Sequence, residues 1–444
     1  MASSTLLIKN GFIVTLGEKN RVLKDHAVLC VGGRIKTIAP ASSFKGKYGK
    51  VIDASGKVVM PGFINAHMHF YSTLVRGLGK AKPSKDFQEV LENLWWRLDK
   101  KLGLDDSYYS ALIPLIDAVK HGTTTLIDHH ASPFAARGSL DRIAKAVKKV
   151  GLRASLCYEL SDRDGEKVAQ DGIDENVEFI KRCQTHRDEA LSALFGLHAS
   201  FTITDKTLAK AAKAGHDLGA GFHVHTAEAK SDQDINQTQF GMRVVERLKK
   251  FGILGPRTIA AHCVHVNEAE MDILKETGTA VAHNPQSNMN NAVGVADIIK
   301  MMGKGVLVGL GTDAMTVNMM EEVRVALWAQ HLAHNNPSVG FMEAFSTLLF
   351  NNAKIANRYF EPKVGALEEG WAADLVTIDY HPPTRFDENT FLGHFGFGIT
   401  QSAVDTTICG GKVLMEGKKL KIDLDEAEVG AKATELAEKL WERF

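Results

Sequence analysis

The chain has 444 residues, of which 44% are apolar and 24% are charged, and its formal net charge at pH 7 is zero. This composition is typical of a globular protein with enough apolar material for a core. Because there is no excess of Lys or Arg, electrostatics gives no reason to expect nucleic acid or an anionic membrane as a partner. The length allows two domains, or one barrel with a smaller companion domain.

The cysteines and the N-terminus bear on the compartment. The five cysteines are an odd number with no Cys-x-x-Cys pair, so we expect free thiols in a reducing compartment rather than a disulfide framework. The first residues have no basic flank leading into an apolar signal core, and no apolar run is long enough to span a bilayer. We therefore expect a cytosolic protein.

Short strand-like runs separated by turns occupy both ends of the chain. Residues 6–14 and 51–59 alternate with Gly-containing turns, and residues 373–378 and the segments after them repeat this pattern. We expect residues 1–60 and 361–444 to form one composite small β domain, a β-sandwich. Two separate small β units are the alternative.

The middle of the chain, residues 61–360, alternates short apolar runs with longer amphipathic segments. The expected strands are residues 125–128, 153–157, 193–197, 221–225, 258–261, 280–282 and 306–310. Repeated β-then-α order favours a parallel sheet, and about eight such units at this length fit a closed (β/α)₈ barrel of the TIM type. A doubly wound open sheet is the runner-up. The barrel is favoured because polar, chemically active residues follow the expected strands, where barrel active sites gather.

The first of these residues form a His-x-His pair, His67 and His69, at the end of a strand-forming run. Alternate residues of a strand point to the same face, so the two imidazoles lie side by side. Neutral histidine is a favoured ligand of divalent transition metals. The pair alone is a moderate signal, because His-x-His also occurs on solvated strands.

Four further polar groups follow later strands: His225 with Glu228, His262, the turn 283–288, and Asp313. Each is more often structural than catalytic when taken alone, for example as a turn residue or a helix cap. Polar side chains that face one another inside a barrel mouth cost free energy unless they pair or bind a metal. A divalent cation held by three histidines and one aspartate would remove that cost.

These five segments together resemble the amidohydrolase superfamily, in the branch that contains deaminases of adenosine derivatives, guanine deaminase and triazine chlorohydrolases. The resemblance extends over essentially the whole chain. Residues 94–98, 127–133 and 287–293 also look like a narrower group, the aminohydrolase group SsnA.

The resemblance implies a set of four metal ligands: His67, His69, His225 and Asp313. It implies that Glu228 carries protons and that His262 polarises water or substrate, with Asp313 also acting in catalysis by orienting the water. One divalent metal is expected; zinc suits this donor set best, and iron(II) would also fit. Relatives with two metals carry a bridging Lys or Glu after the fourth strand, where this chain has Glu159, so a second metal is disfavoured.

Substrate contacts are less clearly indicated. Family resemblance suggests that His198 contacts the heterocycle, while His129, Arg76, Trp95 and Asn288 are further candidates. For each, a structural role is a serious alternative: a strand cap, a core aromatic or a turn cap. We find no match to the ribose-binding residues of adenosine-type deaminases, which favours a free base or another small heterocycle.

The sequence therefore predicts a metal-dependent hydrolase of non-peptide carbon–nitrogen bonds, an aminohydrolase or deaminase of a small, purine-related heterocycle. Opening of a cyclic amide or displacement of chloride from a triazine-type ring would use the same residues. A catalytically silent scaffold is the non-enzymatic alternative. A homo-oligomer is expected by analogy alone.

Overall fold

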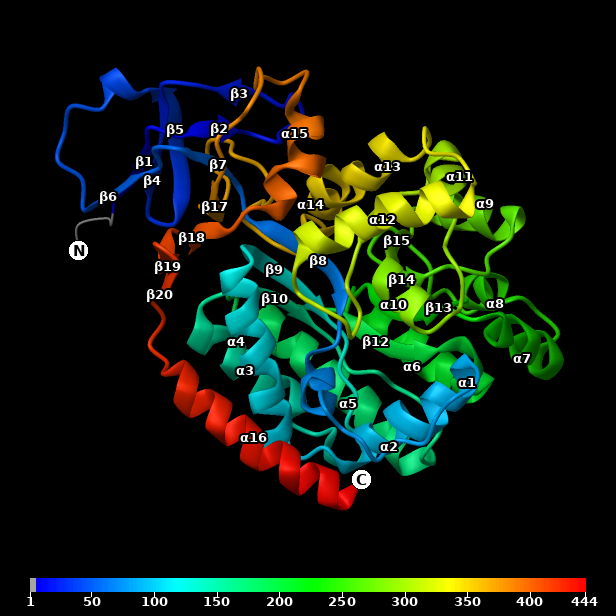
Figure 1. Cartoon of the computed structure of the whole chain (residues 1–444). Helices are drawn as coiled ribbons and strands as arrows, with labels where there is room; N and C mark the ends of the chain where they lie inside the picture. Colours follow the sequence, from blue (N-terminus) through cyan, green and yellow to red (C-terminus); the bar gives the residue numbers. More distant parts are fainter. Residues whose placement is uncertain (1–4) are drawn as a thin grey trace.

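The computed structural model describes residues 5–444. Strands from both ends of the chain form two sheets beside a larger α/β body (Figure 1). Within residues 5–444, no helix has the length and apolar character needed to cross a membrane.

The first sheet uses N-terminal strands alone. Its order is β5 (Arg34–Pro40), β4 (His26–Val31), β1 (Thr5–Lys9) and β6 (Lys50–Asp53). The second sheet mixes the two ends, in the order β20 (Lys419–Leu420), β19 (Lys412–Glu416), β18 (Val404–Cys409), β17 (Leu375–Asp379), β7 (Lys57–Pro61), β2 (Phe12–Val14) and β3 (Val22–Leu23).

The two ends meet where β17 pairs antiparallel with β7, and Leu375 lies opposite Pro61. Alternate apolar residues of both sheets, including Ile8, Ile35 and Ile408, share one buried core. The prediction of a β unit assembled from both chain ends is therefore confirmed.

The body is a closed barrel of eight parallel strands. In order around the barrel they are β8 (Phe63–Met68), β9 (Thr123–Asp128), β10 (Arg153–Leu156), β12 (Phe195–Ala199), β13 (Phe222–Thr226), β14 (Ile259–His262), β15 (Ala280–His283) and β16 (Val308–Leu310), and a short strand β11 (Leu191–Ala193) flanks β10. Backbone hydrogen bonds from Thr312 and Asp313 to His67 O close one seam, and the bridge between Leu160 and Leu197 closes the other. The predicted (β/α)₈ barrel is confirmed.

Helices on the outside of the barrel connect successive strands (Figure 1). The principal ones are α3 (Leu104–Lys120), α4 (Ser139–Val150), α5 (Glu166–Thr185), α6 (Asp205–Asp217), α7 (Lys230–Phe240), α8 (Val244–Lys250), α9 (Glu268–Thr277), α11 (Ile298–Gly303) and α12 (Met319–Ala333). Some of them start at a side-chain cap: Thr204 accepts from the amide of Thr207 at the start of α6, and Asn267 accepts from that of Glu270 at the start of α9.

The last helix, α16 (Glu426–Arg443), lies along α3 of the barrel rather than on the small sheets (Figure 1). The indole Nε1 of Trp441 donates to Leu74 O at 2.8 Å, and Arg443 pairs with Asp106 at 2.8 Å. The domain boundaries near residues 60 and 361 stay a prediction, and these contacts tie the C-terminal helix to the barrel.

The backbone adopts uncommon conformations at several residues that follow the barrel strands. His262, Cys263 and Asp313 all have positive φ angles, which cost free energy for residues other than Gly and tend to occur at functional sites. At Gly311 a Cβ would lie 2.7 Å from the carbonyl oxygen of His67, so only glycine allows this close approach of the first and last barrel strands.

Candidate metal centre and active site

The five polar groups predicted from the sequence meet at the carboxyl ends of the barrel strands. His67 and His69 come from the end of β8, His225 from β13 and His262 from the last position of β14, while the turn 283–288 starts at the last position of β15 and Asp313 follows β16. This is the end at which TIM barrels build their active sites.

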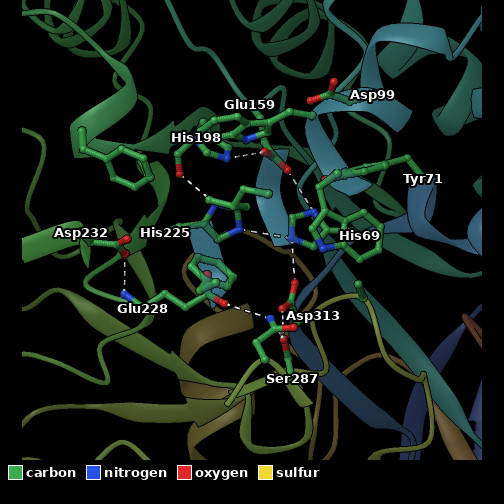
Figure 2. Close-up of a pocket in the computed structure, with 18 of the residues that line it drawn as sticks. His69, Tyr71, Asp99, Glu159, His198, His225, Glu228, Asp232, Ser287 and Asp313 are labelled. Atoms are coloured by element: carbon green, nitrogen blue, oxygen red, sulfur yellow. Dashed lines mark hydrogen bonds and ion pairs between the residues drawn. The ribbon is translucent and has the colours of Figure 1, made fainter. Parts of the chain in front are cut away.

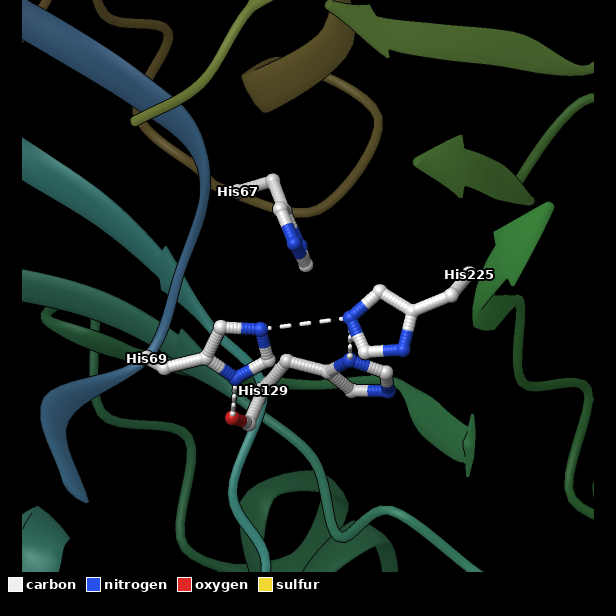
Figure 3. A group of neighbouring side chains, drawn as sticks. All are labelled: His67, His69, His129 and His225. Atoms are coloured by element: carbon white, nitrogen blue, oxygen red, sulfur yellow. Dashed lines mark hydrogen bonds between the residues drawn. The ribbon is translucent and has the colours of Figure 1, made fainter. Parts of the chain in front are cut away.

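Three of the imidazoles are each held through Nδ1. His67 Nδ1 lies 2.9 Å from Nε2 of His223, His69 Nδ1 lies 2.5 Å from the carbonyl oxygen of His129, and His225 Nδ1 lies 2.9 Å from the carbonyl oxygen of His198. Figure 3 shows the rings of His67, His69 and His225 turned toward one another. Anchoring one ring nitrogen fixes the ring and leaves the other free for a metal.

The free nitrogens converge with Asp313. Nε2 of His69 lies 3.2 Å from Nε2 of His225 and 2.9 Å from Oδ1 of Asp313, and Nε2 of His67 lies 3.6 Å from the same oxygen. The buried Nε2 of His67 has no hydrogen-bond partner. Buried polar atoms are normally paired, and this donor set suits a tetrahedral divalent cation, so the residues fit a metal ion.

Two overlapping clusters of possible ligands include these residues: His67, His69, His129 and His225, and His67, His225, His262 and Asp313. In each, the ligand atoms lie within 4.8 Å of one another. A third cluster joins Glu159, His198 and His225. The chain therefore has a His-rich metal site, as predicted.

The electrostatics of the centre favour a positive charge between His69 and Asp313. Burial alone lowers the pKa of His69, but the carboxylates of Glu159 and Asp313 outweigh it and hold that pKa well above its usual range. Burial raises the pKa of Asp313, but the contacts of its carboxylate with the imidazoles of His67 and His69 outweigh that effect and hold the pKa well below its usual range. Burial lowers the pKa of His67 to about 3, which keeps its ring neutral and able to act as a ligand.

Glu228 and His262 lie beside this centre. Oε2 of Glu228 is 3.5 Å from Nε2 of His262, and Nδ1 of His262 is 2.9 Å from Oδ1 of Asn288. Burial, with the nearby carboxylates of Asp313 and Asp232, raises the pKa of Glu228 well above its usual range. A carboxyl group with a raised pKa can hold a proton near neutral pH and release it.

A hydrogen-bonded chain connects the carboxyl groups of Glu228 and Asp313. Ser287 Oγ donates to Oδ2 of Asp313, and Asn291 Nδ2 lies 3.4 Å from Ser287 Oγ and 3.3 Å from Oε1 of Glu228. Ser287 lies in α10 (Pro285–Asn290) and Asn291 caps its end. Residues four apart share a helix face, so both side chains reach the same site.

A cavity opens onto the centre (Figure 2). Aromatic and apolar side chains form one part of its wall: Tyr71, Phe87, Leu91, Trp95, Trp96, Phe201 and Met315. Carboxyl groups form another: Asp99, Glu159, Glu228, Asp232 and Asp313. A cavity with an apolar wall and convergent polar groups is typical of a small-molecule site.

The predicted substrate contacts fall into two groups. Trp95 and His198 line the cavity. Arg76, His129 and Asn288 are not among its lining residues. Arg76 faces solvent, with its side chain 56% exposed and 3.7 Å from Asp117 of α3. His129 is fully buried and stacks on His223, and Asn288 lies behind His262.

Several residues at the site were not found by sequence reasoning. Tyr71, Asp99 and Asp232 line the cavity, Ser287 contacts Asp313, and His223 orients His67. His223 had a signal, since it stands two residues before His225 on the same strand face. Tyr71 and Asp99 had none, because the segment from 70 to 102 consists of short 3₁₀, π and α turns without a regular period.

The fold and the site define a barrel hydrolase of the metal-dependent type. The chain belongs to the amidohydrolase family, whose model matches residues 58–414. A 5-methylthioadenosine/S-adenosylhomocysteine deaminase of Desulforudis audaxviator is 32% identical to it, over 98% of this chain and 99% of that protein. A 5'-deoxyadenosine deaminase of Methanosarcina mazei is also 32% identical, over 98% of each.

Solved structures share the fold. An adenosine deaminase from Xanthomonas campestris with bound zinc superposes with a TM-score of 0.87 at 23% identity, covering 98% of each chain. An atrazine chlorohydrolase from Arthrobacter aurescens TC1, complexed with zinc, gives a TM-score of 0.81 at 22% identity, covering 97% of this chain and all of that one. The predicted enzyme class, a metal-dependent hydrolase of non-peptide carbon–nitrogen bonds, is confirmed.

Proposed function

We propose that this protein deaminates purine nucleosides related to adenosine. Two full-length relatives at 32% identity carry deaminase activities on such compounds, and this supports a nucleoside rather than the free base that the sequence alone favoured. The observation that carries the proposal is the convergence of three anchored imidazoles and Asp313 next to Glu228. Neither ring opening nor chloride displacement has an observation that favours it over deamination.

We assign one divalent metal, zinc in preference to iron, to His67, His69, His225 and Asp313. The unpaired Nε2 of His67 and the 3.2 Å separation between Nε2 of His69 and Nε2 of His225 support this set. When bound, such a cation makes hydroxide available near neutral pH by lowering the pKa of water.

Glu228 is the proposed proton carrier. Its carboxyl lines the cavity, and its raised pKa favours the protonated form that can deliver a proton to the departing nitrogen. Asn291 holds one carboxyl oxygen, so the other is directed toward His262. The chain thus fixes both the position and the orientation of the group that moves the proton.

His262 is the proposed polariser. Oδ1 of Asn288 accepts from its Nδ1–H, and burial lowers its pKa, so in the neutral ring Nε2 is the unprotonated nitrogen. That nitrogen accepts a hydrogen bond and therefore holds the attacking water in line, in preference to donating to an oxyanion. Asp313, whose Oδ2 is held by Ser287, is the second group that orients the water.

Two residues of the cavity wall are proposed substrate contacts. Trp95 and His198 are substrate contacts by their place in the cavity wall. The narrower likeness to the SsnA group, a homo-oligomeric state and a cytosolic location stay predictions.

Release of ammonia tests the proposal. Metal-replete protein is incubated with adenosine, 5'-deoxyadenosine, 5-methylthioadenosine, S-adenosylhomocysteine and free adenine, and ammonia is measured against product absorbance. We expect ammonia from at least one nucleoside in a 1:1 ratio to product, at a higher kcat/KM than from adenine. Product without ammonia would indicate ring opening and contradict deamination.

A further inference from the structure

Glu159 is a buried carboxylate in the cavity wall whose oxygens lack hydrogen bonds from their neighbours. Its side chain is 1% exposed. Oε1 has no hydrogen-bond partner, and Oε2 lies 3.9 Å from Nε2 of His198, which is beyond hydrogen-bond distance. A buried carboxylate without hydrogen bonds is costly, and one that faces a cavity is expected to be satisfied by what the cavity binds.

Positively polarised groups near Glu159 are already engaged, and Nδ1 of His129, 3.7 Å from Oε1, lies beyond hydrogen-bond distance. Nδ1 of His69 lies 3.0 Å from Oε1, but the same nitrogen lies 2.5 Å from the carbonyl oxygen of His129. When a metal ion occupies Nε2, the imidazole of His69 has a single N–H, on Nδ1, and the nearer acceptor of that N–H is the carbonyl oxygen. The guanidinium of Arg163 donates to Asp99 at 2.7 Å and lies over the ring of Trp96.

His198 presents a second acceptor beside Glu159. Its Nδ1 lies 2.9 Å from the hydroxyl of Thr202, and that hydroxyl donates to the carbonyl oxygen of Ala199 at 3.0 Å. The hydroxyl has one proton, so Nδ1 of His198 is the donor and Nε2 is the unprotonated nitrogen. Trp96 and Phe201, each with its ring 6.3 Å from that of His198, supply flat apolar walls for a planar ligand.

We propose that Glu159, together with His198, selects substrates whose ring carries an N–H or amino donor in addition to the amino group that leaves. The inference rests on the proposed nucleoside deaminase function. Glu159 contacts His69 on its Nδ1 side, whereas Nε2 of His69 faces Asp313 and His225. The carboxylate is therefore separated from the reacting centre by an imidazole ring and meets a second polar group of the substrate. The preferred class is diamino purine nucleosides over adenosine.

Binding of two ligands that lack the leaving amine tests this selectivity without relying on turnover. Purine riboside and 2-aminopurine riboside are titrated calorimetrically into the metal-replete wild type. One hydrogen bond to a charged acceptor corresponds to about a 10- to 100-fold tighter Kd for the 2-amino ligand. Glu159→Gln, which keeps a neutral acceptor, should reduce this preference, and Glu159→Leu should remove it. Glu175→Gln changes another buried glutamate, one that accepts from the amides of Gly138 and Leu140 outside the cavity, and should keep the preference.

Melting temperature and metal content separate a role of Glu159 in substrate selection from a structural or metal-binding role. Because Oε1 of Glu159 accepts no hydrogen bond in the protein, the melting temperature of Glu159→Gln should equal or exceed that of the wild type, whereas loss of a structural contact would lower it. Metal analysis should give the same stoichiometry in both proteins. A fall from two metals to one in the variant would overturn the proposal and make Glu159 a ligand of a second ion.

Riboside binding and ammonia release together distinguish a failure of the Glu159 proposal from a failure of the proposed deaminase function. If the wild type releases ammonia from adenosine but binds both ribosides equally well, the role of Glu159 is overturned and the deaminase function stands. If it neither binds the ribosides nor releases ammonia from any purine nucleoside, both proposals are overturned.

Discussion

His223 Nε2 lies 2.9 Å from Nδ1 of His67, and this contact turns the other nitrogen of His67 toward Asp313. His223 is fully buried and stacks on His129, so its own ring cannot move freely. Burial and the neighbouring imidazoles lower its pKa well below the usual range, which keeps it neutral. It thus orients a proposed metal ligand without facing the centre itself.

Replacing His223 with Phe should weaken metal binding without abolishing it. Loss of an orienting partner of a ligand histidine typically costs about 10- to 100-fold in metal affinity. Competition with a chelator of known affinity measures the change, and activity should recover at saturating metal. Unchanged metal affinity in a folded His223→Phe variant would contradict the orienting role.

Glu228→Gln should keep the metal and lose turnover. The amide preserves the shape of the side chain but cannot carry the proton, and general acid–base groups typically contribute about 10²- to 10⁴-fold to the rate. Metal content by mass spectrometry and kcat by ammonia release are measured on the same preparation. Near-wild-type kcat would remove Glu228 from the proton path.

Asn291→Ala should change the pH dependence of activity. The hydrogen bond from Asn291 lowers the pKa of Glu228, against the larger effect of burial, which raises it. Without that bond the pKa of Glu228 rises further, so the limb of the kcat/KM profile that reports Glu228 should move to higher pH. The control is Asn389→Ala, because Asn389 is exposed and does not line the cavity. A profile that stays in place would show that Asn291 does not act on Glu228.

Glu322→Gln should change how stability depends on pH. Glu322 is fully buried in α12, its Oε2 has no hydrogen bond, and burial raises its pKa from 4.5 to about 8. Between pH 4.5 and 8 the carboxyl of Glu322 is therefore protonated in the folded state and ionised in the unfolded state. The free energy of unfolding of the wild type is thus not reduced by this group below pH 4.5, and it falls as pH rises from 4.5 to 8.

In melting experiments at several pH values, Glu322→Gln should thus gain stability relative to the wild type as pH increases from about 5 to 8. A constant difference in melting temperature across that window would contradict the buried, protonated carboxyl.

Sequence reasoning located the residues that stand at strand ends and missed those whose position depends on packing. The alternation of His67 and His69, and the strand before Asp313, follow from local geometry, so the barrel mouth could be predicted. Asn288 shows the limit of such reasoning. It was a candidate substrate contact with a turn cap as the alternative, and only the folded structure shows that α10 directs Ser287 and Asn291 into the site and Asn288 against His262.

Acidic residues show the same limit. The sequence placed Glu159 after the fourth strand, whereas it follows β10, the third strand of the barrel. Only the folded structure shows that its neighbours are engaged elsewhere. Asp99 comes from a segment without helical or strand periodicity, and its pairing with Arg163 joins residues 64 positions apart. Such long-range partners leave no local pattern.

The most direct test of the account is anomalous X-ray diffraction from crystals of the protein loaded with zinc, recorded on both sides of the zinc absorption edge. We expect one strong anomalous peak per chain, within about 2.0–2.2 Å of Nε2 of His67, His69 and His225 and of a carboxylate oxygen of Asp313. Loss of that peak in Asp313→Ala, with the fold retained, would support the ligand set. No peak among these four residues, in protein that still releases ammonia after chelation, would contradict it.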